Sequence, residues 1–162
     1  MRPTQHLTAA IALTMLAACT PTPQPDPQPE PGCAPEVRHD QLPEWARTGF
    51  SEGARVPYSL GRSGRIVAVL FGYPLTQPPV DGKNNKILWV ASPAPASPKA
   101  DPPPSADLVI EARLAGRGDP VRQEVDGGPG PSIVDVPGPG CWRMSLSWSG
   151  RTDTIDVEYA TP

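Results

Sequence analysis

Residues 141–160 read CWRMSLSWSGRTDTIDVEYA, and this stretch decides the fold more clearly than any other part of the chain. Its even-numbered positions 142–148 and its odd-numbered positions 155–159 carry large apolar side chains, with polar residues between most of them. A period of two is typical of strands buried on one face. We expect antiparallel strands at 141–148 and 153–160, joined by a four-residue loop that pairs Leu146 with Ile155, Met144 with Val157 and Trp142 with Tyr159.

Shorter strand patterns precede this hairpin. The run IVAVLF at residues 66–71 is apolar throughout and predicts a strand buried on both faces. Residues 107–114 alternate, which indicates a strand buried on one face. Less marked strands are expected at 55–60, 86–91, 121–125 and 133–136.

Turn residues separate these strands. The chain has 162 residues, of which 25 are proline and 15 glycine, and the prolines concentrate at 21–35, 93–104 and 129–139. The sequence PEWARTG predicts one short helical turn, with Pro43 at its first position and Gly49 as its end. About seven short strands without a crossover helix predict an all-β fold, an antiparallel β-sandwich of immunoglobulin-like character over residues 36–162.

The N-terminus has the organisation of a secretory signal over residues 1–18. Arg2 precedes an apolar run at 7–18 that is shorter than the ~20 residues of a membrane-spanning helix. The following LAAC resembles the lipobox of bacterial lipoproteins, which implies that Cys19 becomes the acylated N-terminus. An ordinary signal peptide with a structural Cys19 is the alternative. Acylated Cys19 would anchor the protein to the lipid bilayer without spanning it.

The anchor implies a location in the cell envelope, on the extracytoplasmic face of the cell membrane or on the outer membrane. Thr20 follows Cys19, where an aspartate would resemble the inner-membrane retention signal of diderm bacteria. The outer membrane of a diderm cell and the single membrane of a monoderm cell both stay open.

Residues 19–35 form the predicted linker, a disordered tail rich in proline. The alternation TPTPQPDPQPEP at 20–31 favours polyproline II, which rises ~3.1 Å per residue and spans about 35 Å here. We interpret it as a spacer that holds the domain clear of the headgroups; a ligand for a proline-binding domain is the alternative.

Two further cysteines, Cys33 and Cys141, remain once Cys19 is modified. Outside the cytoplasm an even pair predicts a disulfide, and closing a loop of ~100 residues contributes up to ~4.7 kcal/mol in the chain-entropy model. Two free thiols are the alternative. No pair of cysteines has the CxxC spacing of a zinc site.

The sequence favours no catalytic site. Residues 49–53, GFSEG, match the G-x-S-x-G pattern, but a nucleophile elbow needs a strand before the serine and a helix after it. The one histidine after the signal, His39, also precedes Ser51, so a serine hydrolase using Ser51 is a remote alternative. We expect Glu111, Asp156 and Glu158 to be solvated, and residues 81–85 to form a turn rather than a calcium loop.

Four sequence blocks resemble recurring blocks of uncharacterised bacterial lipoproteins with Ig-like domains. They are LPEWAR at 42–47, LFGYPL at 70–75, NKILWV at 85–90 and PGPGCWR at 137–143. The resemblance supports the fold and the envelope location, and it implies no catalytic residues.

These observations predict a monomeric, membrane-tethered and non-enzymatic module that binds an envelope protein or glycan, or supports the envelope. Tyr58, Tyr73 and Trp45 are the candidates for its binding surface, and we expect neither a cofactor nor a metal. An inhibitor or accessory domain for an extracytoplasmic enzyme is the alternative. The net charge of −3, with scattered positive residues, argues against a nucleic-acid partner.

Overall fold

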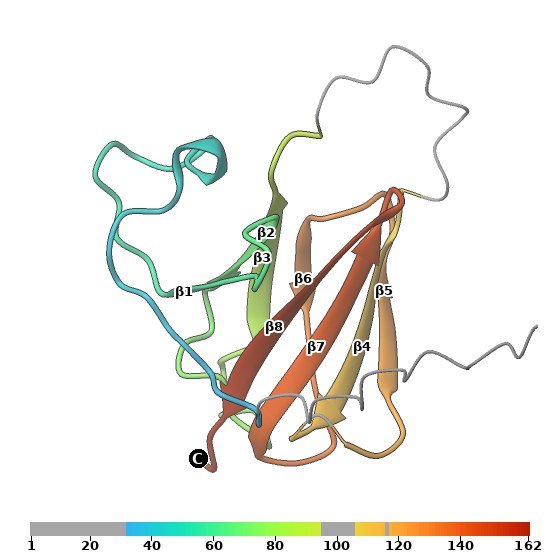
Figure 1. Ribbon diagram of the computed structural model, residues 1–162. Helices are drawn as coiled ribbons and strands as arrows, with labels where there is room; N and C mark the ends of the chain where they lie inside the picture. Colours follow the sequence, from blue (N-terminus) through green and yellow to red (C-terminus); the bar gives the residue numbers. More distant parts are fainter. Residues whose placement is uncertain (1–31, 95–105, 116) are drawn as a thin grey trace, which may run out of the picture. The chain divides into compact units, whose positions relative to one another are not determined.

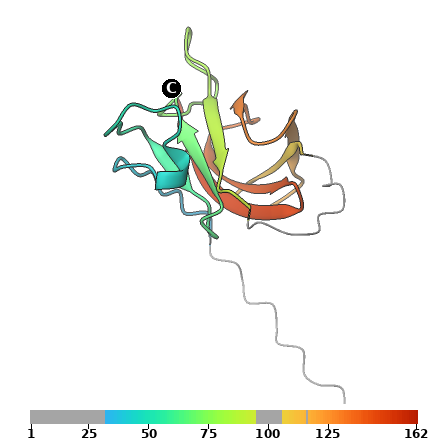
Figure 2. The same ribbon diagram turned by 90° about the horizontal axis from the view of Figure 1, so that it is seen from above.

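The computed structural model describes residues 32–94, 106–115 and 117–162, so Cys19 and residues 1–31 lie outside the described residues. Within the described part, eight strands form two antiparallel sheets of four, and one short 3-10 helix precedes them (Figure 1). The first sheet has the order β1-β2-β3-β6, and the second has the order β5-β4-β7-β8. Seen from above, the two sheets lie beside one another as two layers (Figure 2). The prediction of an all-β, antiparallel, sandwich-like fold is confirmed, with one strand more than expected.

The elements and their bounds follow the sequence pattern closely. The helix η1 spans Glu44–Ala46, and Pro43 lies outside it as the N-cap residue, so the expected turn is a single 3-10 turn. The strands are β1 (Tyr58–Leu60), β2 (Ile66–Leu70), β3 (Lys86–Ala91), β4 (Leu108–Leu114), β5 (Val121–Val125), β6 (Pro131–Ile133), β7 (Gly140–Trp148) and β8 (Arg151–Tyr159).

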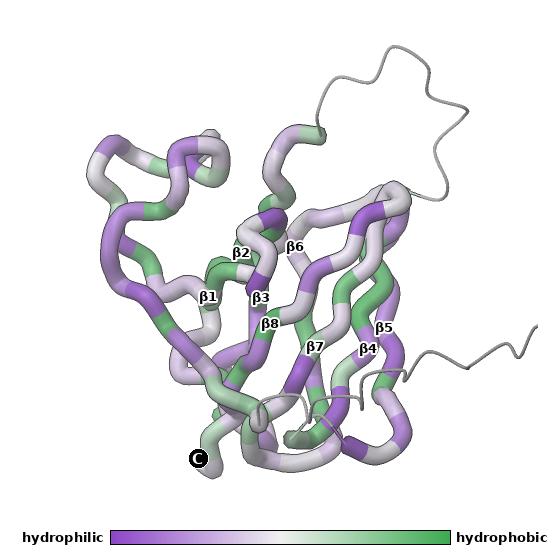
Figure 3. The backbone as a smooth tube through the Cα atoms, viewed as in Figure 1, coloured by the Kyte–Doolittle hydropathy of each residue, from purple (hydrophilic) through white to green (hydrophobic). Residues whose placement is uncertain are grey.

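The main core lies between the two sheets. It combines inward residues of β2 and β3 with those of β4, β7 and β8, and Trp89 is the largest side chain that is fully buried. The strands β7 and β8 alternate between hydrophilic and hydrophobic residues along their length (Figure 3). This alternation places one face of each strand in the core and the other outside, as their sequence predicts.

A second apolar cluster covers the opposite face of the first sheet. Val67 and Val69 of β2 point into it, and Leu42, Ala46 and Tyr58 complete it. All five residues of β2 are therefore buried, which confirms a strand enclosed on both faces. The packing of the segment around η1 on β2 is stabilised because it buries these valines, which would otherwise be exposed to water.

The β7–β8 hairpin differs from the prediction in its register. Met144 pairs with Ile155 and Leu146 pairs with Asp153, a shift of two residues from the expected pairs. The reason is the turn: Ser149 and Gly150 both have positive φ, 43° and 70°, and form a two-residue loop between Trp148 and Arg151. Such turns match the twist of the strands they join. A shift of two preserves the faces, so the predicted inward residues are correct although their partners are not.

The strand expected at 133–136 is also displaced. The ladder of β6 ends at Ile133, and the next residues turn into the core, where Val134 and Val136 are buried. The Tyr159 hydroxyl donates a hydrogen bond to the Val134 carbonyl at 2.7 Å. Val134 and Val136 are therefore apolar because they are buried at the edge of the sandwich, beyond the end of the β6 ladder.

Candidate functional site

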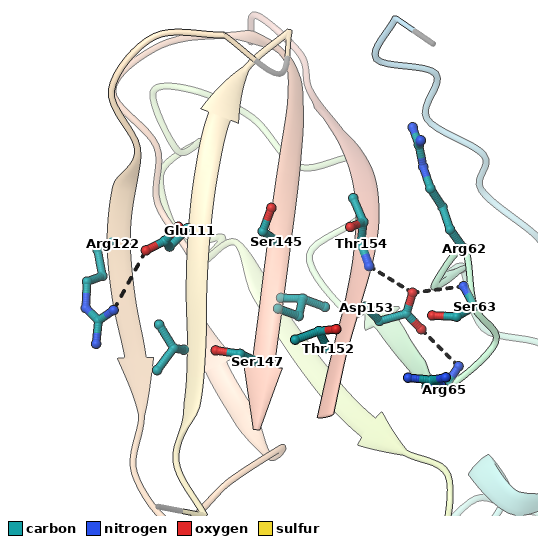
Figure 4. Close-up of a pocket in the computed structure, with 12 residues that line it drawn as sticks. Arg62, Ser63, Arg65, Glu111, Arg122, Ser145, Ser147, Thr152, Asp153 and Thr154 are labelled. Atoms are coloured by element: carbon teal, nitrogen blue, oxygen red, sulfur yellow. Dashed lines mark hydrogen bonds and ion pairs between the residues drawn. The ribbon is translucent and has the colours of Figure 1, made fainter. Parts of the chain in front are cut away.

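A polar groove lies on the outer face of the second sheet. It encloses about 660 Å³, and its floor carries hydroxyl groups from β7 and β8 (Figure 4). One wall is the β1–β2 turn with its two arginines, and the other consists of side chains from β4 and β5. The polar groups that define this groove are Arg62, Ser63, Arg65, Glu111, Arg122, Ser145, Ser147, Thr152 and Thr154.

The floor follows from strand alternation. Met144 and Leu146 of β7 point into the core, so Ser145 and Ser147 between them face outward. Serine and threonine are small, and for that reason this part of the sheet leaves open space above it. None of Ser145, Ser147 and Thr152 has a side-chain hydrogen bond to another described residue, so their hydroxyls are available to a ligand.

Asp153 fixes the wall formed by the β1–β2 turn. Its carboxylate accepts hydrogen bonds from the backbone N–H groups of Ser63 and Arg65, both at 2.9 Å, and from Thr154 at 2.8 Å. Gly61 packs so closely against this carboxylate that a Cβ there would overlap it. The Arg62 N–H also donates to the Thr154 carbonyl at 2.9 Å, which attaches the turn to the free edge of β8. The two arginines therefore stand on a backbone that is held in place.

The charges along the groove are partly neutralised. Arg122 lies 3.9 Å from Glu111 across the strands and also pairs with Glu124. Arg62 donates to Asp156 at 2.8 Å. Arg65 is exposed and forms no ion pair with any residue that the structure describes. The groove thus offers one free guanidinium, a row of hydroxyls and a carboxylate, groups that suit hydrogen bonding to a polar ligand.

A buried ion pair lies beside the groove. Asp156 and Arg143 are 7% exposed each, and Arg143 approaches both carboxylate oxygens, at 2.9 and 3.1 Å. Asp156 also accepts a hydrogen bond from the Ala34 N–H at 2.9 Å. Burial alone raises the pKa of Asp156, but the hydrogen bonds from Arg143, Ala34 and Arg62 outweigh it and lower that pKa from 3.8 to about 2. The expectation that Asp156 is solvated is wrong, because residues 32–34 cover it.

The same crossing of the chain brings Cys33 and Cys141 together. Their sulfur atoms lie at disulfide distance and their Cα atoms are 5.9 Å apart, within the range that a bridge needs. The Arg143 guanidinium also donates to the Gly32 carbonyl at 3.2 Å. The first described residues, 32–34, are therefore fixed on β7 and β8 by a covalent link and by polar contacts.

Two of the three sequence candidates for a binding surface, Tyr58 and Trp45, belong to the second apolar cluster, and Tyr73 lies outside it. Tyr58 is 2% exposed, and its hydroxyl donates to Asp40 at 2.8 Å; burial raises its pKa. Trp45 packs against the second apolar cluster and is half-buried. Tyr73 is 45% exposed and makes an edge contact with His39 at 5.7 Å. The structure does not bring the three together, and none of them lines the groove.

Ser51 lies in the loop between η1 and β1. Its carbonyl accepts a hydrogen bond from Ala54 at 3.0 Å, and the described chain around it has neither a preceding strand nor a following helix. His39 contacts Tyr73 rather than Ser51. The other carboxylates of the sequence analysis differ in setting, since Glu111 lines the groove and Glu158 is exposed on β8.

Sequence reasoning missed the groove, because its walls come from segments about 90 residues apart in the chain. Over the described ranges, no group of three or more His, Cys, Asp or Glu residues is arranged to hold a metal ion. None of the helices in those ranges is long and apolar enough to span a bilayer. Comparison of the sequence with protein-family models, with curated proteins and with solved structures finds no match.

Proposed function

We propose that the protein is an envelope lipoprotein, anchored through acylated Cys19, whose folded domain is a non-enzymatic binding module. The observation that carries this proposal is the fixation of residues 32–34, near the end of the predicted proline-rich linker, to β7 and β8 of the second sheet. A domain held by a tether experiences force at the point where the tether joins it. A covalent link and a buried ion pair at that point suit a domain that hangs from a membrane.

The groove is the binding surface in this proposal. Loops and outer faces of a β-sandwich carry recognition, while the core supplies the scaffold. Hydroxyl groups with a free guanidinium at Arg65 favour a polar partner, an envelope glycan or a polar protein segment. Immunoglobulin-like character belongs to the same proposal and is supported by two four-stranded antiparallel sheets around the buried Trp89.

Two variants test the groove in the lipidated protein. Ser147→Trp fills the floor and Arg65→Ala removes the free cation, whereas Glu52→Trp adds the same bulk at an exposed site outside the groove. A pull-down from intact envelope should retain one specific protein or glycan with the wild-type protein and with Glu52→Trp, and lose it with both groove variants. Retention by all four proteins would assign the partner to another surface.

The anchor has a separate test. Cys19→Ala should release the protein from the membrane fraction, because the acyl chains supply the attachment. Membrane attachment and acylation that stay unchanged in this variant would refute the lipoprotein assignment.

A further inference from the structure

The exposed large hydrophobic residues gather at one end of the sandwich. Over the described residues there are five with exposed fractions from 39% to 52%: Phe71, Tyr73, Val80, Leu114 and Ile133. Single exposed apolar residues are ordinary on protein surfaces, whereas a concentration of them marks a contact site.

Strand pairing defines this end, which we call the tether end. Leu114 is the last residue of β4 and pairs with Trp142, next to Cys141 and its partner Cys33. The N–H of Ala115 donates to the Cys141 carbonyl at 2.7 Å. In space, the first described residues therefore lie beside the last residue of β4 and the first residues of β7.

The β2–β3 connection lies at the same end. Thr76 forms a bridge with Ala160, just beyond β8, which runs antiparallel to β7. Tyr73 lines a hollow of about 400 Å³ together with Pro35 and Val37, which follow Cys33 in the chain. Ile133 pairs with Lys86 at the start of β3. In Figure 1 the β2–β3 connection and the C-terminus lie at the lower end of the sandwich, where the described chain begins.

A second hollow, of about 310 Å³, combines aromatic and cationic side chains. Phe71 and Tyr73 line it together with Lys83 and Lys86, and the Lys86 ammonium lies 5.7 Å from the Phe71 ring centroid. No carboxylate lines this hollow, although the neighbouring Asp81 and Glu158 on β8 also belong to the tether end. Aromatic rings and lysines are the side chains that suit the interface between headgroups and acyl chains.

We propose that the tether end docks on the bilayer that holds the anchor, with Phe71 and Tyr73 at the acyl boundary and Lys83 and Lys86 on lipid phosphates. This rests on the proposed anchor, because the chain that follows Cys19 enters the described domain at this end, where Cys33 is joined to Cys141. The anchor keeps the domain within reach of the bilayer, at an effective concentration on the order of 1 mM, so weak docking is sufficient. The spacer then permits docking instead of holding the domain away from the headgroups.

Lysine acylation measures the docking directly. The lipidated mature protein is reconstituted in phosphatidylethanolamine–phosphatidylglycerol vesicles and treated with an amine-reactive reagent that does not cross membranes. Mass spectrometry follows Lys83 and Lys86, with the rates of the same two lysines in the free chain as the reference. With an effective concentration of ~1 mM and a docking Kd of ~0.1 mM, about nine in ten domains are docked, so both lysines should react about tenfold more slowly than in the free mature chain carrying Cys19→Ser.

Phe71→Ser with Tyr73→Ser should restore fast acylation on vesicles, whereas Arg55→Ser, at an exposed site of the η1–β1 loop, should not. Unchanged thermal unfolding of the double variant shows that its fold is intact; if it unfolds, Val80→Ser takes its place. Protein that sediments with vesicles but has unprotected lysines would overturn the docking alone. Protein that carries the lipid on Cys19 but does not sediment with vesicles would overturn the anchor and the docking together. Equal protection by inorganic phosphate without vesicles would overturn a lipid ligand.

Discussion

Replacing Asp156 with asparagine removes the negative charge from the buried ion pair beneath residues 32–34. The wild-type carboxylate accepts two hydrogen bonds from Arg143, one from Arg62 and one from the Ala34 N–H. Asparagine has one acceptor oxygen, and its amide N–H groups would face guanidinium donors. Arg143 would keep its charge at 7% exposure and would lose its ion pair with Asp156.

The expected loss of stability is large. Removing one partner of a buried ion pair costs about 3–5 kcal/mol, because the remaining charge stays desolvated. We expect Asp156→Asn to lower the free energy of unfolding at pH 7 by this amount. Glu111→Gln, on the same face of the sheet but half-exposed, is the matched control and should change it by less than about 0.5 kcal/mol.

The pH dependence gives a second, independent readout. The pKa of Asp156 is lowered from 3.8 to about 2 in the folded state, so the unfolded chain binds more protons between these values. Stability from this group is complete above about pH 5 and is lost as the pH falls toward 2. At ~1.4 kcal/mol per pKa unit, the contribution is about 2 kcal/mol.

Urea unfolding at pH 7 and pH 3, followed by tryptophan fluorescence, measures both effects. The wild-type protein should lose part of the Asp156 contribution between these pH values, and Asp156→Asn should lack this component. A loss of less than about 1 kcal/mol in the free energy of unfolding of the variant at pH 7 would refute the stabilising role of the ion pair. The same pH dependence as in the wild type would also refute it.

Three further outcomes are expected. Replacing Cys33 and Cys141 together with serine should lower the free energy of unfolding by about 3–5 kcal/mol, since 108 residues separate them; two freely alkylated thiols in the wild-type protein would contradict the bridge. Gly61→Ala should cost about 1–3 kcal/mol because its Cβ overlaps the Asp153 carboxylate, whereas Gly138→Ala, which has open space, should be nearly neutral; equal effects would contradict the close packing. A fluorophosphonate probe should not label the protein, and labelling that disappears in Ser51→Ala would establish a hydrolase.

The strands and their buried faces could be predicted from local sequence. The apolar run of β2 indicated burial on both faces, and the alternation in β4 and β8 indicated which residues point inward. These predictions succeed because the period of a strand is a property of its own backbone. The β7–β8 register failed by two residues, because the loop length depends on whether Ser149 and Gly150 adopt positive φ.

The groove and the ion pair could not be predicted in this way. In sequence, Asp153 and Asp156 are two similar acidic residues of one strand, yet one caps the β1–β2 turn and the other is buried under residues 32–34. Their roles depend on partners 90 and 122 positions away. Nothing in the local pattern distinguishes a carboxylate that faces water from one that another segment covers.

The sequence by itself therefore determined the all-β class, the inward faces of the strands and the pairing of Cys33 with Cys141 as a hypothesis. Only the tertiary structure decided the register of the hairpin, the groove beside Arg65 and the fixation of residues 32–34 on the second sheet. The physical reason is how far apart in the chain the interacting residues lie. Strand periodicity is set by neighbouring residues, whereas burial of a charge and the shape of a groove arise only when distant segments meet.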